Sequence, residues 1–314
     1  MNDVAAAARV SGKIAGFWRR LGALAFDLLL LLVVGMGLGA LLFDPLARMG
    51  SWARVIGFAI ALAYFGIGNS RLAEGQTFGK YGFGLRVVDG GGGLLSVQRS
   101  LLRYTVLGLP FFLNGLPVAP SLPGLEYLLA LIVFGGVLCI VYLYIFNRRT
   151  RQSLHDLVAN SLVVRATPDG EPEVRPMPGP RVWRGHLVAA ALLGLIGLAS
   201  PTVLRRFSDR EILADLIPMQ RALASRQHAL AVQMMRTRFY GGGDGMQYLK
   251  ARVHLDAPML DDAEMARSMA QQMKTMDSDP AAEDAILVDL SYGYDMIIAS
   301  SWTMRRYMFK TADL

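Results

Sequence analysis

Between Leu21 and Phe43 the chain reads LGALAFDLLLLLVVGMGLGALLF, an apolar run of 23 residues that holds one charge, Asp27. At about 1.5 Å per residue, a helix of this length crosses a hydrocarbon core of about 30 Å. The run exceeds the roughly 7–15 apolar residues of a secretory signal peptide, and no small-residue cleavage site follows it. We therefore predict an uncleaved first transmembrane helix.

The composition is that of a membrane protein. Of the 314 residues, 53% are hydrophobic and 18% are charged, against roughly 25% charged residues in soluble domains. A single cysteine, Cys139, excludes a disulfide scaffold and a zinc-thiolate site. Residues 1–204 carry 18 Lys and Arg against 10 Asp and Glu, whereas residues 205–314 carry 14 against 15. Because the excess positive charge flanks apolar segments, it indicates membrane orientation rather than nucleic-acid binding.

Four further segments without charges are candidate spans, at residues 55–70, 104–125, 127–147 and 187–204. The segment 104–125, the third span counted from the N-terminus, is the least regular because it contains four prolines. We expect a helix over residues 99–116 there, followed by a kinked extracytoplasmic loop. With five spans the fold class is an α-helical multi-span membrane domain. If the third segment is re-entrant instead, the sides assigned to all later segments invert.

The distribution of Lys and Arg predicts the orientation, because cytoplasmic flanks collect these residues. Four cations precede the first span, five lie between the second and third, and seven lie between the fourth and fifth. The alternate loops hold only Arg48 and Arg54. We predict a cytoplasmic N-terminus and, after five spans, an extracytoplasmic C-terminal domain. Arg205 and Arg206, at the far end of the fifth span, argue mildly against this orientation.

The remaining segments suggest small folded parts around these spans. Residues 84–89, 94–96 and 161–165 have the β-branched and glycine-turn pattern of a small cytoplasmic sheet. We predict a membrane domain over residues 10–166, a proline-rich linker over 167–181, a fifth transmembrane helix over 182–204 and a small extracytoplasmic α+β domain over 205–314. In that domain we expect helices over 207–238 and 261–276, and strands over 246–255, 285–290 and 296–304.

Sequence motifs for catalysis are weak. The G-x-G-x-G run from Gly35 to Gly39 lies inside the first span, where small residues let helices approach closely. Gly241–Gly245 is typical of a flexible loop, and the four histidines lack metal-ligand spacing. Ser153, His155 and Asp156 are too close in sequence to face one another as a hydrolase triad. We expect no enzyme activity, no cofactor and no metal site.

Asp27 is the residue that calls for an explanation, since a carboxylate at this depth is costly unless it is paired, protonated or hydrated. Arg20 lies two turns earlier on the same helix face, but helical side chains lean toward the N-terminus, so Arg20 points away from Asp27. We expect the partner on another helix, with Arg103, Arg148 or Arg149 as candidates. A structural ion pair and a binding or permeation site both remain open.

Three segments resemble the RDD family of prokaryotic membrane proteins: Gly16–Asp27, Gly75–Asp89 and Arg151–Ala159. The resemblance covers about residues 10–166 and does not extend to residues 182–314. It places the Arg and the two Asp for which the family is named at Arg20, with Arg19 as the alternative, and at Asp27 and Asp156. It implies a multi-span domain in the cytoplasmic (inner) membrane with a suspected role in transport.

Two functions follow as expectations. The first is transport or exchange of ions or small ligands, with Arg20, Asp27 and Asp156 acting as one electrostatic unit near the cytoplasmic surface. Gln76, Lys80 and Arg103 would support it, with Gln76 and Lys80 on one face of a short amphipathic helix beside the lipid bilayer. The alternative is a non-catalytic membrane anchor that presents the C-terminal domain to an envelope protein. A hydrated cavity at Asp27 would favour transport, and a dry, fully paired Asp27 would favour the anchor.

Overall fold

The structure is a computed structural model of the chain, and it describes residues 14–116, 124–166, 182–208, 216–239, 246–280 and 283–314. These residues form two compact units. We call Met1–Gly35 with Arg54–Pro201 the membrane unit, and Met36–Ala53 with Thr202–Leu314 the sheet unit. Each unit is described by itself.

Four helical segments are long and apolar enough to cross a membrane. They are α1 (Phe17–Leu41), the run Phe43–Gly68 made of α2 (Phe43–Met49), η1 (Gly50–Ala53) and α3 (Arg54–Gly68), the run Leu125–Phe146 made of α6 (Leu125–Ala130), η3 (Leu131–Gly135) and α7 (Gly136–Phe146), and the Arg184–Leu204 part of α9 (Arg184–Ser208). At most 33% of the residues in their most apolar windows are buried, so lipid has to cover the rest. The predicted multi-span membrane protein is confirmed.

Helix α5 (Val97–Leu113) corresponds to the irregular third candidate, and its 17 residues are fewer than the usual span of about 20. Strand β1 (Leu85–Asp89) precedes α5, strand β2 (Ser161–Arg165) follows α7, and the two strands pair antiparallel along their whole length. The chain that leaves this end of the membrane unit through α5 therefore comes back to the same end after α7. Helix α5 is not among the four candidate spans, so a fifth crossing through α5 stays a prediction.

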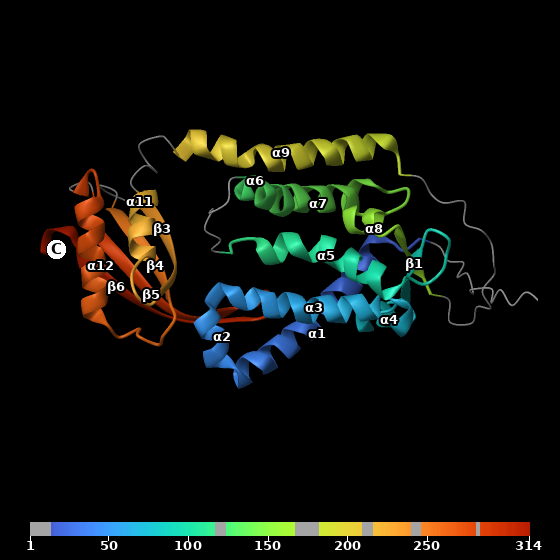
Figure 1. Cartoon of the computed structure of the whole chain (residues 1–314), viewed down its shortest axis with the longest axis horizontal. Helices are drawn as coiled ribbons and strands as arrows, with labels where there is room; N and C mark the ends of the chain where they lie inside the picture. The colour runs from blue at the N-terminus through green and yellow to red at the C-terminus, as the bar shows by residue number, and fades with distance from the viewer. Residues whose placement is uncertain (1–13, 117–123, 167–181, 209–215, 240–245, 281–282) are drawn as a thin grey trace, which may run out of the picture. The chain divides into compact units, whose positions relative to one another are not determined.

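The end of the membrane unit that carries β1 and β2 also carries two short helices (Figure 1). These are α4 (Phe78–Gly82), preceded by η2 (Arg71–Ala73), and α8 (Leu154–Val158). The sheet predicted here has two of its three expected strands. The segment 94–96 is not a strand, because the Ser96 hydroxyl accepts from Arg99 N and caps α5 while Leu95 packs in the apolar cluster beneath β1.

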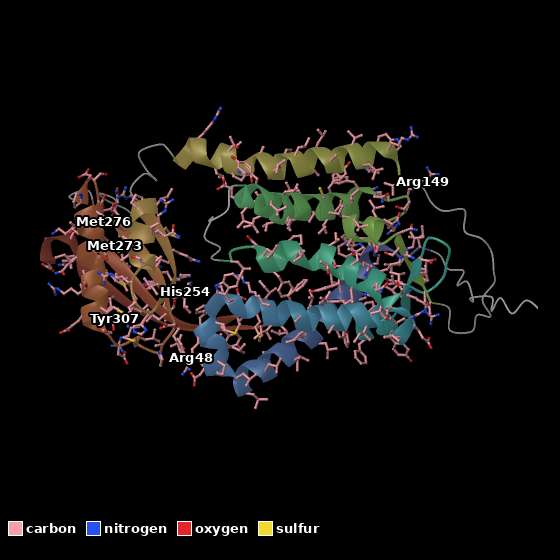
Figure 2. The ribbon with its side chains drawn as sticks, viewed as in Figure 1. Arg48, Arg149, His254, Met273, Met276 and Tyr307 are labelled. Atoms are coloured by element: carbon pink, nitrogen blue, oxygen red, sulfur yellow. The ribbon has the colours of Figure 1, made fainter. Side chains whose placement is uncertain are left out.

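The sheet unit contains a four-stranded sheet in the order β3–β4–β5–β6. The strands are β3 (Ala229–Phe239), β4 (Met246–Leu255), β5 (Ala285–Asp295) and β6 (Ser300–Lys310), and β4 and β5 are parallel. Helix α11 (Leu216–Ala224) and helix α12 (Ala263–Met276) pack on one face, and η5 (Thr311–Asp313) follows β6. Met273 of α12, labelled in Figure 2, and Met269 are both fully buried in the core of this unit.

Two element assignments in this unit are wrong. The helix expected over 207–238 ends at Ala224, and the chain continues as β3, in which buried Val232 lies between residues whose side chains are less buried. Residues 291–294, which separate the strands expected over 285–290 and 296–304, belong to β5, where Gly293 allows a close approach, since a Cβ there would lie 2.1 Å from Ser301 O. Strand β4 and helix α12 match the prediction. Residues 167–181 and 240–245 lie outside the described ranges.

The turn between α1 and α3 belongs to the sheet unit. The Phe43 ring packs edge-on against the rings of Tyr292 and Tyr294, and the Tyr292 hydroxyl donates to Asp44 Oδ1 at 3.2 Å. Residues 36–53 thus complete the packing of β5. That residues 205–314 fold alone stays a prediction.

Candidate functional site

Asp156 joins three helices of the membrane unit through buried charges. It lies in the first turn of α8, where Ser153 and Asp156 form a capping box. Its Oδ1 accepts from Arg103 Nε at 3.0 Å and Nη2 at 2.7 Å, and its Oδ2 accepts from Arg20 Nη2 at 2.7 Å. Since Arg20 lies on α1 and Arg103 on α5, one carboxylate holds α1, α5 and α8 together.

The protonation states keep this cluster charged. Burial raises the pKa of Asp156, but its electrostatic interactions with neighbouring His155, Arg103 and Arg20 outweigh burial and hold that pKa well below its usual range. Burial lowers the pKa of His155 to about 3, so His155 is neutral at pH 7. The two arginines therefore supply the positive charge that keeps Asp156 ionised.

Asp27 forms a second buried cluster. Its Oδ1 accepts from the Tyr64 hydroxyl at 2.6 Å and from Gly79 N at 2.7 Å, and its Oδ2 accepts from the Thr77 hydroxyl at 2.6 Å. Lys80 Nζ lies 4.0 Å from Oδ2. The Asp27 side chain is 0% exposed. Three hydrogen bonds and an ion pair thus replace the water that this carboxylate loses.

Helix α4 brings these groups to Asp27. Thr77 is its N-cap and accepts from Lys80 N, which starts the helix beside α1. Gly79 permits the contact, because a Cβ at this position would lie 2.1 Å from Ala23 O. Burial, together with the charge of Arg103, lowers the pKa of Lys80 to about 7, although Asp27 acts in the opposite direction.

The structure separates the residues predicted to act as one electrostatic unit. Arg20 and Asp156 share a hydrogen bond, whereas Asp27 belongs to the second cluster. Arg103, one of the three candidate partners of Asp27, pairs with Asp156 instead, and the cation beside Asp27 is Lys80. As expected, the described residues show no Arg20–Asp27 bridge.

The predicted amphipathic helix with Gln76 and Lys80 on one face is wrong. Gln76 precedes the N-cap of α4, and its Nε2 donates to Leu85 O at 2.7 Å, which ties this loop to β1. Lys80 faces inward, whereas Phe78 and Tyr81 are 68% and 76% exposed. The one-turn helix therefore has its apolar rings outside and its charge inside.

Sequence reasoning missed Tyr64 and Thr77. Tyr64 gave a weak signal, as a hydroxyl group within an apolar segment, where such a group usually has a polar partner. Thr77 carries the sequence signature of a helix N-cap, but nothing in the local pattern directs its hydroxyl to Asp27.

Within the described ranges there is no group of three His, Cys, Asp or Glu side chains that could hold a metal ion. A cavity of about 480 Å³ lies beside Arg20, and Asp27 is not among the residues that line it. Of the charged residues in the two clusters, Arg20 lines this cavity, whereas Asp27, Lys80, Arg103 and Asp156 do not.

Known proteins match the part of the chain that contains both clusters. The model of the RDD family matches residues 14–160. The chain is 31% identical to "Uncharacterized protein YckC" of Bacillus subtilis (strain 168) over 167 residues, which are 52% of this chain and 91% of that protein. No solved structure matches. Since the match spans almost the whole of that relative and includes Arg20, Asp27 and Asp156, the chain belongs to the RDD family.

Proposed function

We propose that this protein is a non-catalytic membrane anchor that presents its C-terminal domain to a protein partner in the cell envelope. The observation that carries the proposal is the state of Asp27, which is inaccessible to solvent and satisfied by Tyr64, Thr77, Gly79 and Lys80. A permeation site needs a hydrated path to its carboxylate, whereas a structural pair needs none. Buried pairing of this kind fixes how helices pack.

The charges of the membrane unit support the same role. Among the described residues of this unit, the buried charged side chains are Arg20, Lys80, Arg103, Asp27 and Asp156, and each has an opposite charge within 4.0 Å. They connect α1 to α4, α5 and α8 at the end that carries β1 and β2. Such connections hold the helix ends in one arrangement, which a stable anchor requires.

The sheet unit offers a surface for the partner on the sheet face opposite α11 and α12. Register places Lys250, Arg252, Arg306 and Lys310 on this face, with Asp289 as the acid of the central strand. Met235, Met304 and Met308 on the same face are exposed. A basic face with exposed methionines suits an acidic protein surface that carries apolar side chains.

The anchor requires that the C-terminal domain lie outside the cytoplasm, which the proposed five crossings from a cytoplasmic N-terminus would achieve. We expect a reporter that is active only in the cytoplasm to be inactive when fused after Leu314. The same reporter fused after Ala166, next to β2, should be active. An active reporter at Leu314 would contradict the proposed orientation.

Exchange of protons against another cation is the second candidate, and Lys80 is the observation that favours it. A buried lysine whose pKa is about 7 changes charge near neutral pH, here 4.0 Å from a carboxylate. Protonation of Lys80 and cation binding at Asp27 would then exclude each other. Cation exchange requires that the wild-type protein carry ions across a membrane, whereas the anchor requires only that the folded protein be stable.

The substitution Asp27→Asn distinguishes the two candidates, because it removes the charge and keeps the shape. For the anchor we expect a loss of about 1–3 kcal/mol of unfolding free energy, the usual cost of an impaired buried polar contact, and no ion flux from wild-type protein. Denaturant unfolding in detergent and flux in proteoliposomes measure the two quantities. Asp44→Asn is the control, since it changes a carboxylate outside both clusters. Wild-type flux that disappears in Asp27→Asn without a change in stability would overturn the anchor.

A further inference from the structure

The cavity beside Arg20 lies where α1 begins and α7 ends. Three arginines, Arg20, Arg148 and Arg151, line it, and no carboxylate does. Arg20 is already paired with Asp156. Arg148 and Arg151 have no acidic partner in the described part of the chain, so the cavity carries two uncompensated positive charges. A ligand that fits it is an anion.

The other wall of the cavity is aromatic. Phe17 packs against Trp18 and Tyr144, with ring centroids 5.1 and 5.0 Å apart. Trp18 is 78% exposed and lies in the first turn of α1, which is a candidate membrane span. Trp and Tyr are enriched at the level of lipid headgroups, so this wall belongs at the membrane interface. The cavity thus joins a cationic side to an apolar side at the depth where a headgroup meets its acyl chains.

The loop after α7 holds the arginines in place before any ligand arrives. Asn147 Nδ2 donates to the Thr150 hydroxyl at 2.7 Å and to Gln152 O at 2.9 Å, and Arg151 N donates to Asn147 O at 2.8 Å. Arg151 has φ +52°, a left-handed conformation that is unfavourable for a residue with a Cβ. Its carbonyl oxygen accepts from Arg20 Nη1. Strain of this kind is maintained where the position of a group matters.

Asn147 is one of the residues that line the cavity, and one of its side-chain atoms is a buried acceptor. Asn147 Oδ1 has no hydrogen-bond partner in the described part of the chain, and both Nδ2 hydrogens are already used. A phosphate oxygen cannot satisfy an acceptor, but a hydroxyl group can. A ligand that carries a phosphate and a neighbouring hydroxyl therefore complements both the arginines and Asn147.

We propose that this cavity binds the headgroup of an anionic phospholipid, with the phosphodiester on Arg148 and Arg151 and a glycerol hydroxyl toward Asn147. The guanidinium groups suit a phosphate because they donate two parallel hydrogen bonds. The acyl chains leave along Trp18 and Ile145, which are exposed. The site is separate from the Asp27 cluster and does not depend on whether the protein anchors or exchanges.

The test uses the full-length protein in nanodiscs of phosphatidylcholine, alone or with added phosphatidylglycerol. We expect phosphatidylglycerol to raise the melting temperature of the wild type and native mass spectrometry to show a retained phosphatidylglycerol. Arg148→Gln and Arg151→Gln should each lose at least half of that shift. Arg149→Gln is the matched control, because Arg149 lies in the same loop (Figure 2) but does not line the cavity. It should keep the full shift.

Further arms separate the alternatives. Inorganic phosphate added to phosphatidylcholine nanodiscs should not reproduce the shift; if it does so in full, and phosphatidylglycerol adds nothing, the site takes a soluble anion and the proposal is wrong. An equal loss in Arg148→Gln and Arg149→Gln would reduce the effect to general surface charge and would also overturn it. Arg148→Lys keeps the charge without the paired donors, so its shift should be larger than that of Arg148→Gln and smaller than that of the wild type. This comparison does not depend on Arg151→Gln, which could disturb the loop.

Discussion

Asp156→Asn is expected to lower the unfolding free energy by about 3–5 kcal/mol, the cost typical of removing one member of a buried ion pair. The substitution leaves the guanidinium groups of Arg20 and Arg103 buried without a counter-charge. An asparagine can accept a hydrogen bond from one arginine, but its amide nitrogen would face the other donor. The connection between α1, α5 and α8 therefore weakens at its centre.

Denaturant unfolding of the full-length protein in detergent measures the loss, and Glu74→Gln is the control. Glu74 also pairs with an arginine, at 3.0 Å from Arg86, but its side chain is 75% exposed. An exposed pair is worth about 1 kcal/mol or less. If Asp156→Asn were no more harmful than Glu74→Gln, Asp156 would not join the three helices.

Much of the membrane unit could be predicted because its membrane spans are indicated by the sequence of each segment alone. An apolar run of sufficient length implies a span whatever lies around it, and Asp27 stands out within such a run. The identity of its partner is not local. Lys80 is 53 positions further along the chain and reaches Asp27 only because α3 returns the chain and Gly79 lets α4 touch α1. The spacing of residues within one helix carries no information about that contact.

The errors in the sheet unit have a related cause. Residues 229–238 contain apolar residues at spacings that fit a helix and a strand equally well. The segment forms a strand because it pairs with β4, whose residues lie outside the segment itself. The strand expected to end at residue 290 continues to Asp295 for the same reason, because Gly293 accommodates the backbone of β6 in the sheet. Tertiary contacts overrode local preference at both positions.

Gly79→Ala should be nearly as harmful as Asp156→Asn, although it adds only one methyl group. The new Cβ would lie 2.1 Å from the backbone oxygen of Ala23, a distance that no side-chain rotation relieves, and 2.8 Å from Asp27 Oδ1. Helix α4 would have to move away from α1, and the bond from Gly79 N to Asp27 would be lost with it. Overpacking typically costs about 1–3 kcal/mol. The weakened hydrogen bonding of a buried carboxylate adds to that cost, so we expect a loss of about 3 kcal/mol.

Gly82→Ala is the matched control, since Gly82 belongs to the same short helix and a Cβ there would meet nothing within 4 Å. It should leave the unfolding free energy within about 0.5 kcal/mol of the wild type, as a substitution in open space does. The comparison separates close approach from a general need for glycine in α4. If both substitutions were equally harmful, backbone flexibility would explain the effect. If both were harmless, α4 would not be held against α1, and the pairing of Lys80 with Asp27 would lose its structural basis.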